Sequence, residues 1–374
     1  MPRPPVDSAL SSHSDIHAWL RLALVPGVSP AVQRALLKEF GTPQRVVGAS
    51  RGAVALRAGE KVAQLITQGP SAAALDAAFT WLAKPGCHLL AIGDAQYPGA
   101  LLDITDPPTV LYAQGKLELL NKPSFAIVGS RNATAQGLRD AQAFARALSD
   151  AGLAIVSGLA LGIDAAAHRG GLAGAGSSVA VMGTGPDIIY PRRNHELAHA
   201  LAGQGCLISE FPVGTPSLAG NFPRRNRLIS GLARGVLVVE AALPSGSLTT
   251  ARFALEQDRD VFAIPGSIHS PLSRGCHWLI KEGAKLVESA DDVLAELGGG
   301  IVARSVPLEA TQPGKVEPIL DAMGFAPATL DQLAQRTGLD AATLAAQLAH
   351  LEIEESVAAL PGGWFQRVAK RVIE

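Results

Sequence analysis

The sequence predicts an α/β protein: an extended Rossmann-like, mostly parallel sheet with an N-terminal helical module and a C-terminal winged-helix domain. Three observations support this fold class. Short runs between residues 125 and 266 are apolar throughout and alternate with Ala-rich helical stretches, a pattern typical of parallel strands covered by helices on both faces. Residues 15–82 carry apolar side chains at helical spacing. Residues 316–371 read as three helices followed by a hairpin, the order of a winged helix.

Length, charge and cysteine content are those of a soluble globular protein with two or three domains. The 374 residues carry a formal charge of −1, so any affinity for nucleic acid must come from local clusters of charge. The three cysteines, Cys87, Cys206 and Cys276, lie far apart, which disfavours a disulfide framework and a cysteine zinc site. We expect a cytoplasmic protein without a membrane span, because no signal-peptide pattern is present and the apolar runs are short.

Composition divides the chain into five segments. We predict a flexible tail at residues 1–14, a helical module at 15–82, an extended Rossmann-like domain at 83–298, a linker at 299–315 and a winged-helix-like domain at 316–374.

The helical module has two interpretations. Its turn VPGVSP, residues 25–30, lies between two short helices, as in SAM-like or helix-hairpin-helix modules, some of which bind a DNA backbone. Its glycine pattern is incomplete, which favours a plain packing domain. Both interpretations stay open.

The strands of the central domain are expected in the following order along the chain. They are HLLAIGDAQYP (88–98), PTVLYAQG (108–115), FAIVG (125–129), LAIVSG (153–158), SVAVMG (178–183), CLISE (206–210), GVLVVEA (235–241) and DVFAIPG (260–266). The first two precede the alternating pattern and are expected to extend the same sheet.

Turns rich in small residues and hydroxyls follow these strands. The carboxyl ends of parallel strands share one edge of a sheet, where free N–H groups of turns and helix N-termini can meet anions. The turns comprise residues 129–137, 157–164, 183–187, 244–251 and 265–267. We therefore expect a polyanion to bind along this edge.

A dinucleotide or ATP cofactor is disfavoured, and we expect no cofactor and no metal. The first turn reads Gly129-Ser130-Arg131 and does not match GxGxxG, and no acidic residue ends the next strand. The segment SGSLTTA, residues 245–251, lacks the lysine of a phosphate-binding P-loop.

Arginines concentrate in the segment 192–234, which contains six of them against two carboxylates. Arg224, Arg225 and Arg227 follow Phe222 at the start of a helix on the ligand edge. Guanidinium groups can bind successive phosphates while an aromatic ring stacks on a base, and this stacking does not depend on sequence. The pattern predicts binding of single-stranded nucleic acid.

A series of motifs in order identifies a resemblance. They include AIVGSR, SGLALGIDAAAH, GTGPDIIYPRRN, LISEFPVGTP, NFPRRNRLISGL, VVEAALPSGSLTTA and GCHWLIKEGA. Together they resemble the DNA-processing protein A family (DprA, also called Smf) over roughly 200 residues. The flanking helical and winged-helix modules are much less specific.

The resemblance implies a cytoplasmic bacterial protein that is not an enzyme and that binds single-stranded DNA without sequence preference. It implies protection of incoming DNA, help in loading the RecA recombinase during transformation, and a homodimer formed through the Rossmann-like domain. The DNA-binding residues that it implies are Gly129, Ser130, Arg131, Ser157, Gly158, Phe222, Arg224, Arg225, Asn226, Arg227, Ser245, Gly246, Ser247, Thr249 and Thr250.

A nucleotide-processing enzyme of the same fold is the alternative. Phosphoribohydrolases resemble this chain in the phosphate-binding turn, but their signature PGGxGTxxE places a glutamate soon after the threonine. Here Ala251 and Arg252 follow the threonines, and Glu256 comes more than a helical turn later. This difference favours binding without hydrolysis.

Two further motifs have structural and chemical interpretations. HELAH, residues 195–199, matches HExxH, and Glu210 or Glu240 could supply a third zinc ligand, but the longer metalloprotease pattern is missing. Asp164 and His168 could form an acid–base pair, although helix capping and a polar pair explain them without catalysis.

The third helix of the predicted winged helix is acidic. DAATLAAQLAHLEIEESV, residues 340–357, contains one aspartate, three glutamates and no lysine or arginine. Phosphates would be repelled by this helix, so we predict that it binds protein, or another part of its own chain, in place of DNA.

Overall fold

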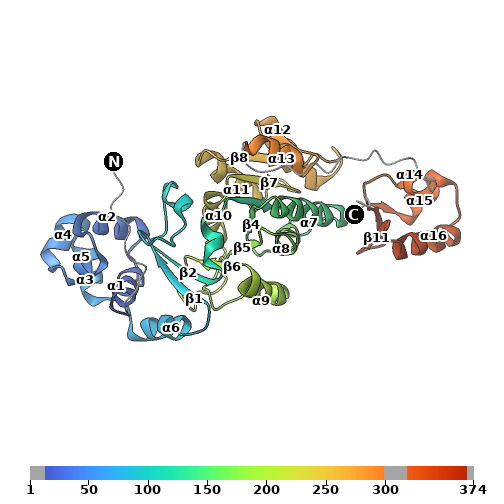
Figure 1. Ribbon diagram of the computed structural model, residues 1–374. Coiled ribbons are helices and arrows are strands. Elements are labelled where there is room, and N and C mark those ends of the chain that lie inside the picture. Colours follow the sequence, from blue (N-terminus) through green and yellow to red (C-terminus); the bar gives the residue numbers. More distant parts are fainter. Residues whose placement is uncertain (1–12, 299–317, 369–374) are drawn as a thin grey trace.

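The structure is a computed structural model that describes residues 13–298 and 318–368 and arranges them as three bodies in a row (Figure 1). The helical module lies at one end, the large sheet in the middle and the small C-terminal domain at the other end. The predicted linker lies outside the described residues, as does the predicted tail except for its last two positions, where the first helix begins.

Six helices form the N-terminal module. They are α1 (His13–Ala23), α2 (Pro30–Phe40), α3 (Pro43–Gly48), α4 (Arg51–Ala58), α5 (Glu60–Gln68) and α6 (Ala72–Leu82). Serine or threonine side chains cap α2, α3, α4 and α6 by accepting a hydrogen bond from a first-turn N–H group. The module has its own core, which includes Leu22, Leu36 and Val46.

A nine-stranded sheet forms the central body. Its order is β1-β2-β6-β5-β4-β3-β7-β8-β9. The strands are β1 (Cys87–Ala91), β2 (Val110–Gly115), β3 (Ser124–Val128), β4 (Ala154–Ser157), β5 (Ser178–Val181), β6 (Cys206–Ser209), β7 (Gly235–Val238), β8 (Asp260–Ala263) and β9 (Lys285–Leu286). Strands β3 to β9 run parallel, and β2 joins β6 antiparallel. All eight expected strands are present, and β1 and β2 extend the sheet as predicted.

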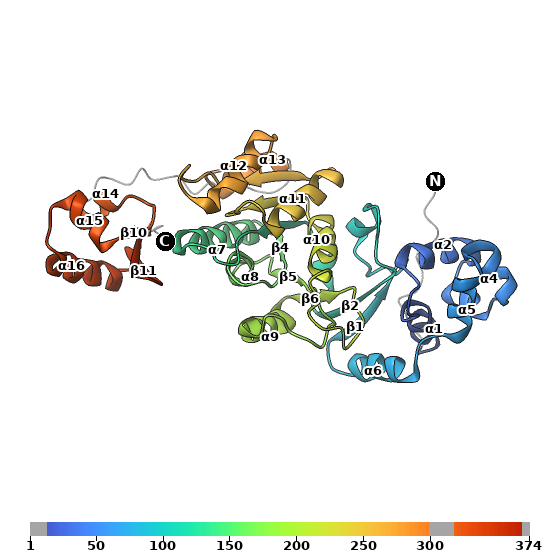
Figure 2. The same cartoon turned by 180° about the vertical axis from the view of Figure 1, so that it is seen from behind.

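Helices cover both faces of this sheet (Figures 1 and 2). One face carries α7 (Ala135–Asp150), α8 (Ile163–Ala173), α9 (His195–Gln204) and α13 (Ala290–Leu297). The other face carries α10 (Asn221–Leu232), α11 (Gly246–Glu256) and α12 (Arg274–Lys281), with the 3₁₀ turns η1 (Gly99–Leu102) and η2 (Leu117–Asn121). Burial of the parallel strands on both sides explains why they read as continuous apolar runs.

The antiparallel strands connect the first two bodies. Trp81 of α6 packs edge-on against Tyr112 of β2, with ring centroids 5.6 Å apart. Leu20 of α1 and Leu24, directly after this helix, belong to the same cluster. The helical module therefore leans on the end of the sheet that β1 and β2 add.

The C-terminal body is a winged helix, as predicted. It contains α14 (Pro318–Met323), α15 (Leu330–Thr337) and α16 (Ala341–Ile353), and a three-stranded sheet in the order β10-β12-β11. The strands are β10 (Ala328–Thr329), β11 (Val357–Leu360) and β12 (Trp364–Arg367). It contacts α7 through long hydrogen bonds, such as 3.4 Å from the Gln136 N–H group to Gln366 Oε1.

Two observations complete the fold. Strand β9 was not anticipated, because its two residues, Lys285 and Leu286, are exposed and too short for a pattern. Among the helices of residues 13–298 and 318–368, none has both the length and the apolar character needed to cross a bilayer.

Candidate nucleic-acid interface

Helix α10 connects the turns at the carboxyl edge of the sheet. Its residue Phe222 lies beside the turns after β3 and β5. Arg225 lies against the turn after β4 and donates to the last residue of β5. Asn226 Nδ2 donates to the Gly246 carbonyl at the start of α11 over 3.2 Å. The helix that carries the predicted arginines thus brings together residues up to about 120 positions apart in the chain.

Phe222 lies in a small aromatic cluster, which we define as Arg131, Tyr190 and Phe222. The Arg131 Cζ atom is 5.7 Å from the Phe222 ring centroid, and the Tyr190 ring is 5.6 Å away at 42°. A Cβ on Gly183 would come within 2.7 Å of the Phe222 ring, so only glycine allows this packing. Phe222 is half-buried, whereas Arg131 and Tyr190 are exposed, which leaves part of the ring accessible for stacking.

Arg225 points inward and supports the turn after β4. Its side chain is buried, and Nη1 donates to the Val181 carbonyl over 2.6 Å. A Cβ on Gly158 would overlap the guanidinium group, so glycine is required there. The Gly158 N–H group donates to Asp164 Oδ2 over 3.1 Å, which ties the same turn to α8.

Burial is the main cause of the shifted pKa values of Arg225 and Asp164. It lowers the pKa of Arg225 to about 10, and the nearby Asp164 opposes this shift. Burial also raises the pKa of Asp164, against the effect of the Arg225 charge and of the N–H groups of Ala160 and Gly158. A guanidinium group and a carboxylate therefore lie together directly under the turn at residues 157–160.

Arg224 and Arg227 share one carboxylate. Glu210 Oε2, just after β6, accepts from Arg227 Nη2 over 2.5 Å and from Arg224 Nη2 over 3.1 Å. The side chains of Glu210 and Arg227 are 1% and 8% exposed, whereas that of Arg224 is 44% exposed and stacks on Phe211. Burial raises the pKa of Glu210, and the two guanidinium groups act in the opposite direction.

The expectation of three arginines on an open rim is therefore wrong for Arg225 and Arg227. Both guanidinium groups are buried and engaged inside the protein, because α10 turns them toward the sheet. Only Arg224 of the three reaches solvent. Arg131, from the turn after β3, supplies the other guanidinium group beside the ring.

The turn after β3 is tightly packed against the end of β7. The Ser130 N–H group donates to the Glu240 carbonyl over 2.7 Å, and a Cβ on Gly129 would come within 2.9 Å of the same oxygen. The Glu240 carboxylate accepts from the Thr134 N–H group over 2.9 Å and from its hydroxyl over 2.6 Å, at the start of α7. The protein's own carboxylate thus occupies the helix N-terminus where a Rossmann fold places a pyrophosphate.

Three of the six predicted serines and threonines are buried. Ser157 donates to the Ile127 carbonyl over 2.7 Å and is fully buried, and Ser247 and Thr250 are buried on α11. Ser245 caps α11, with its Oγ 2.7 Å from that of Ser247. Gly246 is exposed and Thr249 is half-exposed, so these two residues offer the accessible part of this turn.

Asp164 and His168 do not form the polar pair considered above. His168 Nε2 accepts from the Leu159 N–H group over 3.2 Å, and its Nδ1 lies 2.8 Å from the Ser178 hydroxyl. Asp164 accepts from the N–H groups of Gly158 and Ala160. Each side chain instead binds the turn after β4, and this supports their structural role.

A His168→Gln variant is expected to lose the rise of stability with pH that this histidine contributes. Burial and the charges of Arg225 and Arg169 lower the pKa of His168 to about 3, from 6.5 in an unfolded chain. Between these values the unfolded chain binds the extra proton, so the free energy of unfolding rises with pH by up to about 1.4 kcal/mol per unit and levels off above the unfolded pKa. Urea unfolding at about pH 5, 6 and 7 measures the slope.

The parent-minus-variant difference isolates this effect. Asp164, Glu210 and Glu240 have raised pKa values, which make stability fall as pH rises through their range, and all three remain in the variant. His350→Gln, an exposed change in the winged helix, serves as the control. Equal slopes for parent and His168→Gln would contradict the prediction.

The HELAH segment does not form a recognisable metal centre. The rings of His195 and His199 meet edge to face, with centroids 4.5 Å apart. The two carboxylates considered as a third ligand are engaged elsewhere, Glu210 with arginines and Glu240 with Thr134. Within residues 13–298 and 318–368, no three His, Cys, Asp or Glu side chains are grouped so that they could hold a metal ion.

Sequence reasoning missed two contributors to the edge. Tyr190 lies in the motif GTGPDIIYPRRN, but nothing in the local pattern shows that its ring meets Phe222, 32 positions later. Glu210 is one of the two carboxylates within residues 192–234, and its place directly after a buried strand on the ligand edge was the available signal.

Comparisons with known sequences agree with this architecture. Residues 88–298 match the family model for DNA recombination-mediator protein A, and residues 303–363 match that for the DprA winged helix domain. The chain is 44% identical to Protein Smf of Escherichia coli, over 78% of this chain and 80% of that protein. It is 49% identical to DNA processing protein DprA of Streptococcus pneumoniae, over 54% of this chain and 72% of that protein.

Solved structures give the same relationship. The X-ray structure of DprA from Streptococcus pneumoniae matches 77% of this chain and 99% of that chain, with a TM-score of 0.67 and 38% identity. DNA processing protein A from Helicobacter pylori, whose structure concerns its single-stranded DNA binding mode, matches 56% of this chain and 95% of that chain, with a TM-score of 0.52 and 30% identity. The chain therefore belongs to the DNA recombination-mediator protein A family.

Proposed function

We propose that this protein binds single-stranded DNA, without sequence preference, across the exposed end of α10. The aromatic cluster carries the proposal: an accessible ring, Phe222, lies beside an exposed guanidinium group, Arg131, and a second exposed ring, Tyr190. Rings stack on any base, and guanidinium groups bind the phosphates between bases. The Helicobacter pylori relative, which has a single-stranded DNA binding mode, supports the same ligand.

The predicted binding residues then divide by accessibility. We propose direct contacts from Ser130, Arg131, Phe222, Arg224, Gly246 and Thr249, which are exposed or half-exposed. We propose that the buried residues shape the edge from behind: Ser157, Gly158, Arg225, Asn226, Arg227, Ser247 and Thr250. Two half-buried residues join them, because Gly129 packs against the Glu240 carbonyl and Ser245 caps α11.

The affinity for an oligothymidine is expected to fall with salt at a log–log slope near −3. Four exposed arginines, Arg131, Arg192, Arg193 and Arg224, lie on this edge and the turn after β5. If each neutralises one phosphate, the slope is about −0.7 per contact for a single strand. Fluorescence anisotropy titrations across a salt series, with unlabelled duplex as competitor, measure both the slope and the preference for single strands.

Single variants sharpen this test. Arg131→Gln is expected to make the slope shallower by about 0.7, whereas Arg252→Gln, an exposed arginine paired with Glu256 on α11, is expected to leave it unchanged. A parent protein that binds duplex and single strands equally, or with a slope near zero, would contradict the proposed function.

The recombination role is proposed from the family. We propose that the protein protects incoming single strands and helps to load the RecA recombinase during transformation and recombination, and the family model's description as a recombination mediator supports this. A sequence-independent binder suits such a step, because the recombinase must receive strands of any sequence.

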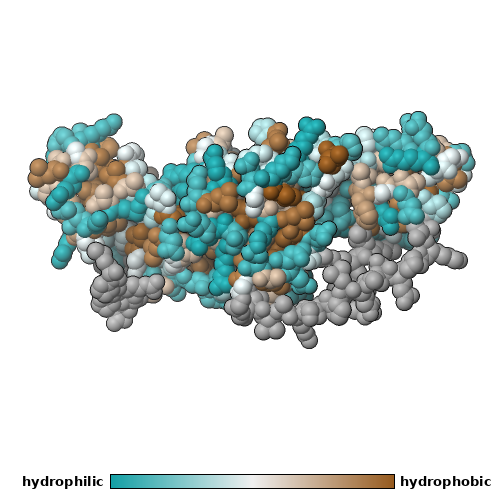
Figure 3. All heavy atoms as spheres, turned by 90° about the horizontal axis from the view of Figure 1, so that it is seen from above, coloured by the Kyte–Doolittle hydropathy of each residue, from teal (hydrophilic) through white to brown (hydrophobic). Residues whose placement is uncertain are grey.

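A homodimer through the central body is also proposed. Leu243, Ile268 and Trp278 are large apolar side chains with exposed fractions of 52%, 75% and 44%. Their loops are neighbours, since the Ala241 N–H group donates to the Leu272 carbonyl and the Gly266 carbonyl lies 2.9 Å from His277 Nε2. Seen from above, apolar patches lie on the central part of the molecule (Figure 3). Exposed apolar groups of this kind support an association surface.

The alternative of a nucleotide hydrolase has little support from this edge. Glu256, the only carboxylate of the segment SGSLTTARFALE, is exposed and lies 3.7 Å from Arg252 at the far end of α11. A carboxylate at this place is remote from the turn at residues 245–247 that would hold a phosphate. We therefore assign no catalytic step.

A further inference from the structure

A row of charged side chains links the N-terminal module to the proposed DNA-binding edge. Arg34 of α2 donates through Nη2 to Asp106 Oδ1 over 2.6 Å and through Nη1 to the Pro107 carbonyl over 2.5 Å. The other oxygen of Asp106 lies 3.7 Å from Arg227 Nη2. The row thus passes from the helical module through the loop before β2 to α10.

The row ends at the arginine that reaches solvent. Glu210 Oε2 receives both Arg227 and Arg224, at 2.5 and 3.1 Å. Arg224 has the longer contact and the greater exposure of the two. Two anions and three cations therefore alternate in what we call the arginine–carboxylate row, which is Arg34, Asp106, Arg227, Glu210 and Arg224.

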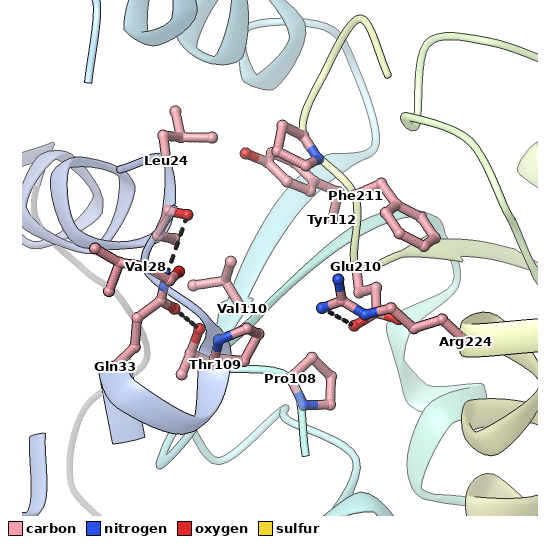
Figure 4. A pocket seen from close by; sticks show the side chains of 13 residues that line it. Leu24, Val28, Gln33, Pro108, Thr109, Val110, Tyr112, Glu210, Phe211 and Arg224 are labelled. Atoms are coloured by element: carbon pink, nitrogen blue, oxygen red, sulfur yellow. Dashed lines mark hydrogen bonds and ion pairs between the residues drawn. The ribbon is translucent and has the colours of Figure 1, made fainter. Parts of the chain in front are cut away.

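A cavity separates the two bodies beside this row. It has a volume of about 150 Å³ and is lined on one side by Leu24, Val28 and Gln33 and on the other by Glu210 and Arg224 (Figure 4). Thr109 donates to Gln33 Oε1 over 2.5 Å at the end of the cavity beside the N-terminal module, and Arg224 pairs with Glu210 at the opposite end. One polar contact thus joins the module to the loop before β2, and the other joins α10 to the segment after β6.

We propose that the N-terminal module sets the position of Arg224 through the arginine–carboxylate row, with Arg34 as a positioning residue for strand binding. The inference rests on the proposed function. Asp106 lies between two guanidinium groups, and loss of Arg34 leaves it to pair with Arg227 alone. Arg227 then interacts more weakly with Glu210. The buried carboxylate of Glu210 interacts more strongly with Arg224 as a result, and holds its guanidinium group away from a phosphate.

A double-mutant cycle tests this coupling. Dissociation constants for an oligothymidine are measured at one salt concentration for the parent, Arg34→Gln, Arg224→Gln and the double variant. Arg34→Gln is expected to weaken binding about threefold in the parent and to have no effect when Arg224 is already replaced, because networked side chains are coupled and independent ones add.

A matched control comes from the same module. Arg57 pairs with Glu39 over 2.6 Å on the surface, outside the row, so Arg57→Gln removes the same charge and is expected to leave affinity unchanged. Thermal unfolding of each variant shows that it is folded. Equal effects of Arg34→Gln in both backgrounds would overturn the inference and leave the proposed function intact. Absence of binding by the parent would instead overturn the proposed function, and the inference with it.

Discussion

Replacing Phe222 with alanine is expected to weaken single-stranded DNA binding by about five- to 150-fold. The half-buried ring lies beside Arg131 and Tyr190, and a stacked base contributes about 1–3 kcal/mol. Because stacking involves no net charge, the salt dependence should stay that of the parent while the affinity falls. Anisotropy titrations with an oligothymidine at several salt concentrations measure both quantities.

Phe325→Ala is the matched control for this change. Phe325 is 55% exposed in the winged helix and also carries an arginine over its face, with Arg367 Cζ 4.9 Å from the ring centroid. Its loss should leave affinity unchanged. If Phe325→Ala weakened binding as much as Phe222→Ala, the aromatic cluster would not be the stacking site.

Replacing Arg225 with alanine is expected to lower the free energy of unfolding by about 3–5 kcal/mol. The change leaves Asp164 buried without its compensating charge, and it removes the donor to the Val181 carbonyl. Arg224→Ala, one position earlier, should cost less than about 1 kcal/mol, because Arg224 is partly exposed and Glu210 keeps Arg227 as a partner. Urea unfolding of the two variants gives the comparison.

Affinity measurements should show the opposite order for the two arginines. Under conditions where Arg225→Ala remains folded, Arg224→Ala is expected to reduce DNA affinity more, since only its guanidinium group reaches solvent. If urea unfolding gave similar free energies for Arg224→Ala and Arg225→Ala, Arg225 would not be the internal support that its contacts indicate.

The sheet could be predicted because its information is local. Runs such as FAIVG and GVLVV are apolar at every position, and a strand buried on both faces produces this pattern wherever it lies in the chain. The short strand β9 produces no such pattern. The family motifs also cluster at strand ends, which is why the edge that carries the site was found.

The orientation of the arginines depends on distant partners. Arg225 binds Val181, 44 positions earlier, and Arg227 binds Glu210, 17 positions earlier, so no local pattern reveals these contacts. One local signal existed: Arg225 precedes Leu228 and Leu232 by three and seven residues and therefore shares their buried helix face. The density of arginines indicated a binding surface, but the position of each arginine around the axis of α10 determines whether it is exposed there.

The carboxylate of Glu240, bound at the start of α7, has a consequence for competition in the cell. Free dinucleotides and nucleoside triphosphates are abundant anions, and the place where related folds admit them already holds a negative charge here. This charge is expected to disfavour a small anion at that turn, whereas a strand bound as proposed would meet Arg131, Phe222 and Arg224 farther along the edge. We therefore expect the buried Glu240 carboxylate to contribute to selectivity for a polynucleotide over single nucleotides, beside the attractive contacts.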